Sequence, residues 1–147
     1  MTLDPATLRY DLLPASLDDI IRTNRDQTEL RLSSTQEIDA LVGKIEIALD
    51  AKDEINNWRL ISLVDKASKV AQVLLLGDSR AQRHPGITSP VLTIDFEQGI
   101  AITRSKSVYK LGDRGYGEPP QPDLYCLCAA MHSWGKGIAL GVPQFSY

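Results

Sequence analysis

Thr88–Gly112, which reads TSPVLTIDFEQGIAITRSKSVYKLG, is the most informative segment of the chain. Leu92, Ile94 and Phe96 alternate with polar residues, as a strand with one buried face requires. Gly99 stands in the short connection that follows, where a hairpin turn favours a left-handed backbone. The pattern therefore predicts an antiparallel β-meander with strands over residues 92–96, 100–103 and 108–111.

Helical patterns precede the meander. Ser34 and Glu37 form a capping-box pattern, and apolar residues follow them at helical spacing. A second apolar stripe ends at Gly77. Because no Gly or Pro lies between residues 44 and 76, one long helix over residues 35–76 stays open. A helical hairpin with its turn near residues 52–53 suits a compact domain better, since two apolar stripes then face each other.

Residues on either side of these patterns complete the predicted fold. Ser16 is a candidate cap for a shorter helix over residues 17–31, and Pro122 opens a last helix that ends at Gly135. A closing strand is expected over residues 138–142. The predicted fold class is α+β, with an N-terminal helical hairpin packed on a small, mainly antiparallel β-meander sheet and a C-terminal helix. We expect one domain over residues 1–147, divided into an irregular arm (1–15), a helical part (16–77) and the meander with the C-terminal helix (88–147).

Composition narrows the classes of function. The 147 residues are 43% hydrophobic and 24% charged, which is typical of a globular protein. The net charge is −3, so no strong overall field draws the molecule to nucleic acid or to a membrane. Residues 1–77 carry 9 basic against 13 acidic side chains, whereas residues 78–147 carry 7 against 6. The absence of a signal-peptide pattern or an apolar span predicts a cytoplasmic protein without membrane contact.

The segment Leu74-Leu75-Leu76-Gly77-Asp78-Ser79 resembles the Gly-Asp-Ser block of the GDSL hydrolase family. The resemblance covers about six residues and implies a nucleophilic Ser79 with a base supplied by a late Asp-x-x-His. Ala81 and Ala129 stand three residues before His84 and His132, so that second motif is missing. We therefore expect Ser79 to lie in a turn after a helix that ends at Gly77.

Cys126, Cys128 and His132 have the composition of a metal site but not its spacing. On a helix, positions i and i+2 point about 200° apart, and two ligands do not complete a tetrahedral zinc site. The sequence therefore predicts no metal and no cofactor. The two cysteines are expected to be free thiols, in agreement with a reducing compartment.

Basic and hydroxyl side chains gather between residues 80 and 114. A cluster of this kind can bind phosphate, nucleic acid or an acidic protein surface, although the same cations can simply protect a sheet edge. The candidate binding residues form a basic strip of Arg80, Arg83, Arg104, Ser105, Lys106, Tyr109, Lys110 and Arg114. Tyr116 is a further candidate for stacking.

Three classes of function follow from the sequence. The first is a small non-enzymatic protein-binding or regulatory protein, of the accessory type common on bacterial and phage genomes, which engages a protein partner and is a candidate homodimer. The second is a nucleic-acid-binding accessory protein that uses the basic strip. The third is a small serine hydrolase that uses Ser79 and a histidine. The first class is preferred, so enzymatic activity is not expected.

Overall fold

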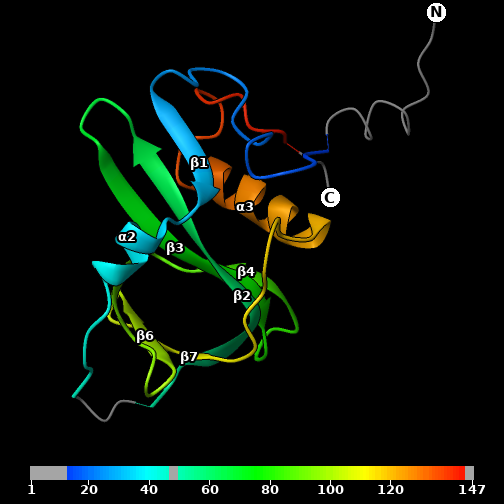
Figure 1. Cartoon of the computed structure of the whole chain (residues 1–147). Coiled ribbons are helices and arrows are strands. Elements are labelled where there is room, and N and C mark those ends of the chain that lie inside the picture. The colour runs from blue at the N-terminus through cyan, green and yellow to red at the C-terminus, as the bar shows by residue number, and fades with distance from the viewer. Residues whose placement is uncertain (1–12, 47–49, 145–147) are drawn as a thin grey trace, which may run out of the picture.

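The computed structural model describes residues 13–46 and 50–144 (Figure 1). The arm predicted for residues 1–15 falls largely outside this part of the chain. In chain order the elements are β1 (Thr28–Leu32), α2 (Thr35–Asp39), β2 (Asp53–Asp65), β3 (Val70–Ser79), β4 (His84–Ile87), β5 (Val91–Asp95), β6 (Ile100–Thr103), β7 (Val108–Leu111) and α3 (Gln121–Ser133).

A seven-stranded mixed sheet dominates the fold. Its order is β4-β3-β2-β7-β6-β5, and β1 pairs with β2 beside that path. One edge of the long strand β2 pairs with two different strands. Its first residues pair in parallel with β7, and its last five pair with β1 in the antiparallel sense. Figure 1 shows β6 and β7 lying at one end of β2 and β3, with β1 and α3 near the other.

The predicted helical hairpin is wrong, because residues 53–79 form the β2–β3 hairpin instead. Both faces of this hairpin are buried, so apolar residues occupy consecutive positions and imitate helical spacing. Leu60 belongs to one hydrophobic core, whereas Ile61 and Leu63 belong to another. Successive side chains of a strand point to opposite faces, which explains why neighbouring residues enter different cores. Neither a long helix nor a helical hairpin is present here.

The two cores lie on opposite faces of β2 and β3. The first joins these strands to α3, β1 and the segments before β1 and after α3; it includes Leu17, Ile20, Ile61, Leu124 and Met131. The second joins the same strands to the β5–β7 meander; it includes Ile55, Trp58, Leu75, Ile94 and Ala101. Helix α3 packs on β3 and β4. The β2–β3 hairpin therefore separates the two cores and contributes side chains to both.

The remaining predictions divide into confirmed and wrong ones. The expected meander strands are present as β5, β6 and β7, and the helix opened by Pro122 is α3. The capping box is formed by Ser34 and Glu37, but α2 is only five residues long. The helix expected over residues 17–31 is wrong, since turns lead there into β1, and residues 138–142 form turns and not a strand.

Candidate functional site

Two cations of the predicted basic strip meet at one carboxylate. Arg80, which follows β3, places a guanidinium nitrogen 3.4 Å from Glu54 Oε2, and Lys110 of β7 places Nζ 3.6 Å from Glu54 Oε1. The hydrogen bond from Asn56, together with the charges of Lys110 and Arg80, lowers the pKa of Glu54. We call Glu54, Arg80 and Lys110 the Glu54 cluster. Its cations already have an acidic partner.

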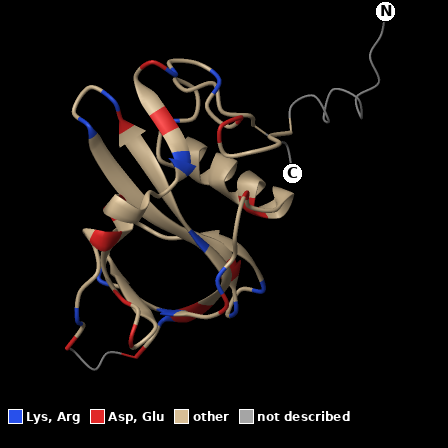
Figure 2. Ribbon diagram, in the orientation of Figure 1, with Lys and Arg blue, Asp and Glu red and all other residues tan. Residues whose placement is uncertain are grey.

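Other members of the strip lie in turns. Arg83 is in the β3–β4 turn and Lys106 in the β6–β7 turn, both with positive φ. Ser105 Oγ lies 3.0 Å from Ser89 Oγ, so this hydroxyl joins the turn to the start of β5. Tyr109 is half-buried against the second core. Arg104 is exposed in the same turn as Lys106. Figure 2 shows acidic and basic residues interspersed along the same loops and strand ends.

Arg114 has a different environment from the rest of the strip. Its guanidinium carbon lies 5.1 Å from the ring centroid of Trp58 and 5.6 Å from that of Tyr116. Phe96 also stacks on Trp58, with ring centroids 6.3 Å apart. Within the described part of the chain, no carboxylate or hydrogen-bond acceptor contacts the Arg114 guanidinium.

Trp58 is the buried centre of this arrangement. It is 4% exposed, and its Nε1–H donates to Gly112 O at 2.9 Å. The preceding residue, Asn57, has φ 51, and the β2–β3 register shifts between Asn56 and Arg59. This bulge in β2 lets the backbone of Trp58 pair with residue 114 as an isolated bridge. The loop after β7 is thereby fixed beside the indole ring.

The buried side chain of Arg59 forms hydrogen bonds with the backbone of the same loop. It is 7% exposed and donates to Tyr116 O at 2.8 Å, Gly117 O at 2.9 Å and Asn57 O at 3.1 Å. Gly115 leaves room for it, because a Cβ at that residue would lie 2.4 Å from an Arg59 nitrogen. A buried cation therefore sets the path of the loop that presents Tyr116.

A shallow hollow of about 150 Å³ adjoins this loop. Its lining combines backbone, apolar and basic groups from Leu32, Ser33, Ile38, Arg59, Leu60, Arg114, Gly115, Tyr116 and Gly117. Two of the side chains that line it are exposed, at 78% for Tyr116 and 37% for Leu32. Phe96, which stacks on Trp58, is 42% exposed. Arg114 contacts Trp58 and also lines the hollow, so it connects the two groups. We call Leu32, Phe96, Arg114 and Tyr116, together with the buried Trp58, the Trp58 face.

Sequence reasoning found Arg114 and Tyr116 but missed the other contributors. The sequence predicts Phe96 on the buried side of its strand, whereas β5 ends at Asp95 and Phe96 is exposed in the turn that follows. Leu32 comes from β1, which was expected to be part of a helix. A signal for Arg59 was present, because it is a lone cation in the apolar run from Trp58 to Val64. Such a residue needs buried acceptors.

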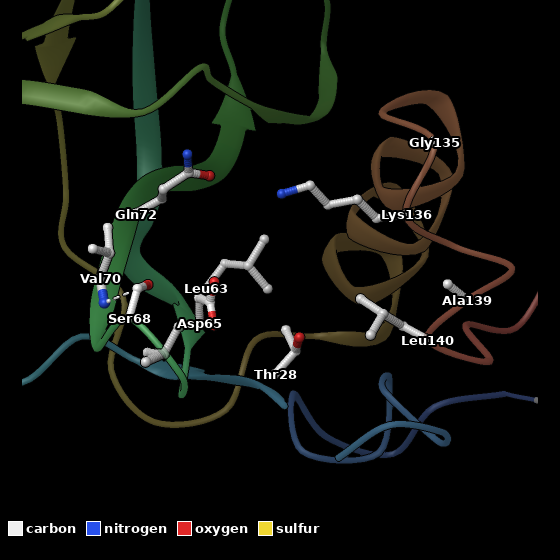
Figure 3. A pocket seen from close by; sticks show the side chains of 11 residues that line it. Thr28, Leu63, Asp65, Ser68, Val70, Gln72, Gly135, Lys136, Ala139 and Leu140 are labelled. Carbon is white, nitrogen blue, oxygen red and sulfur yellow. Dashed lines mark hydrogen bonds between the residues drawn. The ribbon is translucent and has the colours of Figure 1, made fainter. Parts of the chain in front are cut away.

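A larger cleft of about 520 Å³ lies between the β2–β3 hairpin and the segment that follows α3. Leu63 and Leu140 line it from the two sides, and Figure 3 shows Lys136 extending toward the strands that carry Gln72. Asp65 also lines the cleft, but its Oδ1 accepts a hydrogen bond from Ala67 N. The cleft thus combines apolar walls with polar groups of both signs.

Ser79, the candidate nucleophile, is a buried residue at the end of β3. Its hydroxyl donates to Asp53 Oδ2 and accepts a hydrogen bond from Gln82 N. Burial raises the pKa of Asp53, but hydrogen bonds from Ser79 and Ala81 outweigh it and leave this pKa below the usual value. His84 pairs with Ser79 across β3 and β4, yet its Nδ1 lies 2.7 Å from Pro85 O. These contacts hold the β3–β4 turn together.

Asp123 is the most deeply buried carboxylate of the described residues. It lies in the first turn of α3, is 1% exposed, and its Oδ2 has no hydrogen-bond partner in the described ranges. Burial and repulsion by Asp78 raise its pKa to about 6, and the charge of Arg59 opposes that rise. A buried acid with such a pKa makes the stability of the fold depend on pH.

Comparisons with family models, curated proteins and solved structures found no match for this chain. Among the described residues, no three His, Cys, Asp or Glu side chains gather as a metal site would require. Burial raises the pKa of Cys128 to about 12, so this thiol is a poor metal ligand at neutral pH. Neither α2 nor α3, the helices of the described part, has the length and apolar character needed to cross a bilayer.

Proposed function

We propose that this chain is a non-enzymatic binding protein that engages a protein partner through the Trp58 face. The observation that supports this function is the environment of Arg114. Its guanidinium lies against Trp58 and Tyr116, and no acidic group in the described residues neutralises it. The Glu54 cluster, by contrast, pairs each of its two cations with a carboxylate oxygen.

The composition of the face supports a protein partner. Trp, Tyr and Arg are the residues most enriched among the side chains that dominate binding energy at protein interfaces. Tyr116 is 78% exposed, and its loop is fixed by the hydrogen bonds of Arg59. A fixed loop loses little conformational entropy on binding. We place the protein in the cytoplasm, in agreement with its unbridged cysteines, Cys126 and Cys128.

Affinity capture from the native host, quantified by mass spectrometry, tests the proposed function. Wild-type protein is compared with Tyr116→Ala and with the matched control Ile138→Ala, whose side chain is 87% exposed but lies after α3 and outside the face. We expect a protein that wild type and Ile138→Ala retain and that Tyr116→Ala loses by about tenfold or more, as truncation of an interface anchor does.

Purification of that partner and calorimetric titration against the three proteins then give the affinities directly. If the captured proteins are the same for wild type and Tyr116→Ala, in identity and in amount, the Trp58 face is not the docking site and the proposal is wrong.

A further inference from the structure

The hollow of the Trp58 face has an excess of positive charge. Two guanidiniums line it, from Arg59 and Arg114, and no acidic residue does. Of the nearby carboxylates, Glu37 accepts hydrogen bonds from Arg31 and from Ser62. Glu37 is therefore already paired. Because Arg59 lies within electrostatic reach of Asp123, the charge that is left for a ligand to balance is that of Arg114.

Other arginines of this protein form ion pairs with carboxylates of the same chain, unlike Arg114. Arg25 lies 2.7 Å from Asp18, and Arg31 contacts Glu37 through two nitrogens at 2.6 and 3.0 Å. Arg114 instead meets two aromatic rings. Aromatic faces attract the charge of a guanidinium, whereas its five N–H donors lie in the plane and point along its edge. Because no acceptor in the described residues contacts the Arg114 guanidinium, its donors are left for another acceptor.

A carboxylate is the acceptor that matches this edge. Its two oxygens can receive two parallel N–H groups from one guanidinium, and such charge-assisted pairs are about twice as strong as neutral hydrogen bonds. Leu32 and Tyr116 supply apolar surface beside Arg114. An acidic side chain followed by an apolar one therefore matches the face in both charge and hydrophobicity.

We infer that the partner docks a segment in which an Asp or Glu precedes an apolar residue, with the carboxylate bound edge-on by Arg114. This inference rests on the proposed function and names its partner's chemistry. Arg59 acts as a positioning residue, since its donors are engaged by carbonyls of the loop.

Blocked dipeptides test the inference without knowledge of the partner. N-acetyl-Glu-Leu-amide and N-acetyl-Gln-Leu-amide are titrated into the full chain while two-dimensional NMR follows Arg114 Nε–H and Trp58 Nε1–H. We expect the glutamate probe to shift both signals and to bind about tenfold more tightly than the glutamine probe, because a charge-assisted pair replaces a neutral hydrogen bond.

Two variants locate the binding. Arg114→Lys keeps the charge but removes the planar fork, so the affinity for the glutamate probe should fall about tenfold. Arg104→Lys makes the same change in the β6–β7 turn, outside the face, and should leave the affinity unchanged. No shift with the glutamate probe at its highest soluble concentration, equal binding of both probes, or tighter binding of a phosphoserine probe would each overturn the inference.

The capture experiment separates this inference from the proposed function. Loss of the partner in Arg114→Gln as well as in Tyr116→Ala supports both. If Arg114→Gln retains the partner and Tyr116→Ala loses it, the inference of an acidic segment is wrong, but the Trp58 face is still the docking site. Retention by both variants overturns the docking face itself.

Discussion

The Glu54 cluster and the Trp58 face use basic residues of the same predicted strip in opposite ways. Around Glu54, Arg80 and Lys110 share one carboxylate. At Trp58, Arg114 is held by aromatic rings and has no carboxylate among the described residues. The first arrangement offsets part of its positive charge within the chain, and the second leaves its positive charge without an acidic partner in the described residues. A count of cations in the sequence treats the two alike.

The difference shows that availability for binding depends on the local partner and not on the charge itself. An exposed ion pair contributes little to stability but reduces the local charge that a ligand meets. An arginine on an aromatic ring keeps its full charge and its donors.

Removing the ring that supports Arg114 should have the largest effect. Trp58→Ala is expected to lower the free energy of unfolding by about 3–5 kcal/mol, because a buried indole is replaced by a cavity. Its hydrogen bond to Gly112 O is lost as well. Denaturant unfolding followed by circular dichroism measures the change. Trp134→Ala is the control, since Trp134 is 40% exposed. Equal losses in the two variants would contradict a central role for Trp58.

Asp123 provides the next largest effect, because it lies within electrostatic reach of Arg59 without a hydrogen bond to it. Its pKa is raised to about 6 in the fold, first by burial and then by Asp78, whereas an unfolded chain has the ordinary value near 3.8. Between these two values the folded state holds a proton that the unfolded state has released. Stability from this group is therefore full below about pH 4 and is lost as the pH rises through about 6.

Asp123→Asn removes that titration. The free energy of unfolding of the variant minus that of wild type should rise by about 2–3 kcal/mol between pH 4 and pH 7. Denaturant unfolding at several pH values measures it. Asp78→Asn, which removes the second cause of the shift, should move the midpoint to lower pH without abolishing the change. A difference that stays constant over this pH range would contradict the prediction.

The sequence predicts elements with one buried face better than elements with two. The three meander strands are present as expected, although the alternation placed Leu92 and Phe96 on the buried face and both are 42% exposed. A single apolar face with a Pro start identified α3. Residues 60–64 and 73–76 are apolar at almost every position because β2 and β3 separate two cores. Such a run does not distinguish a strand from a helix by periodicity. The capping box at Ser34 was a true helix start, but it says nothing about helix length.

The candidate site was partly predictable for a related reason. The basic residues of the strip are visible as a group because they lie close in sequence. The Trp58 face joins residues from β1, β2, the β5–β6 turn and the loop after β7, and the bulge at Asn57 brings two of these together. Residues 32, 58, 96 and 114 have no sequence pattern in common. Their proximity depends on a parallel pairing of β2 with β7 that local patterns do not reveal.

A double-mutant cycle measures the interaction of Arg114 with Tyr116. The coupling free energy between Arg114→Ala and Tyr116→Ala should be about 0.5–1 kcal/mol, as expected for an exposed cation–π contact. Each single variant should unfold cooperatively, because Tyr116 is largely exposed. Thermal or denaturant unfolding of the four proteins provides the value. Strict additivity would mean that the ring does not hold the guanidinium in solution.

Releasing the cations of the Glu54 cluster should change binding more than stability. Glu54→Gln leaves Arg80 and Lys110 without their carboxylate, so this end of the sheet should gain salt-sensitive affinity for a short DNA duplex at low ionic strength. Fluorescence anisotropy at two salt concentrations measures the gain over wild type. Asp113→Asn is the control, because it removes one negative charge outside the cluster. If wild type already binds the duplex as tightly as Glu54→Gln does, the pairing with Glu54 does not restrain these cations. The contrast between the cluster and the Trp58 face would then fail, since both would display free charge.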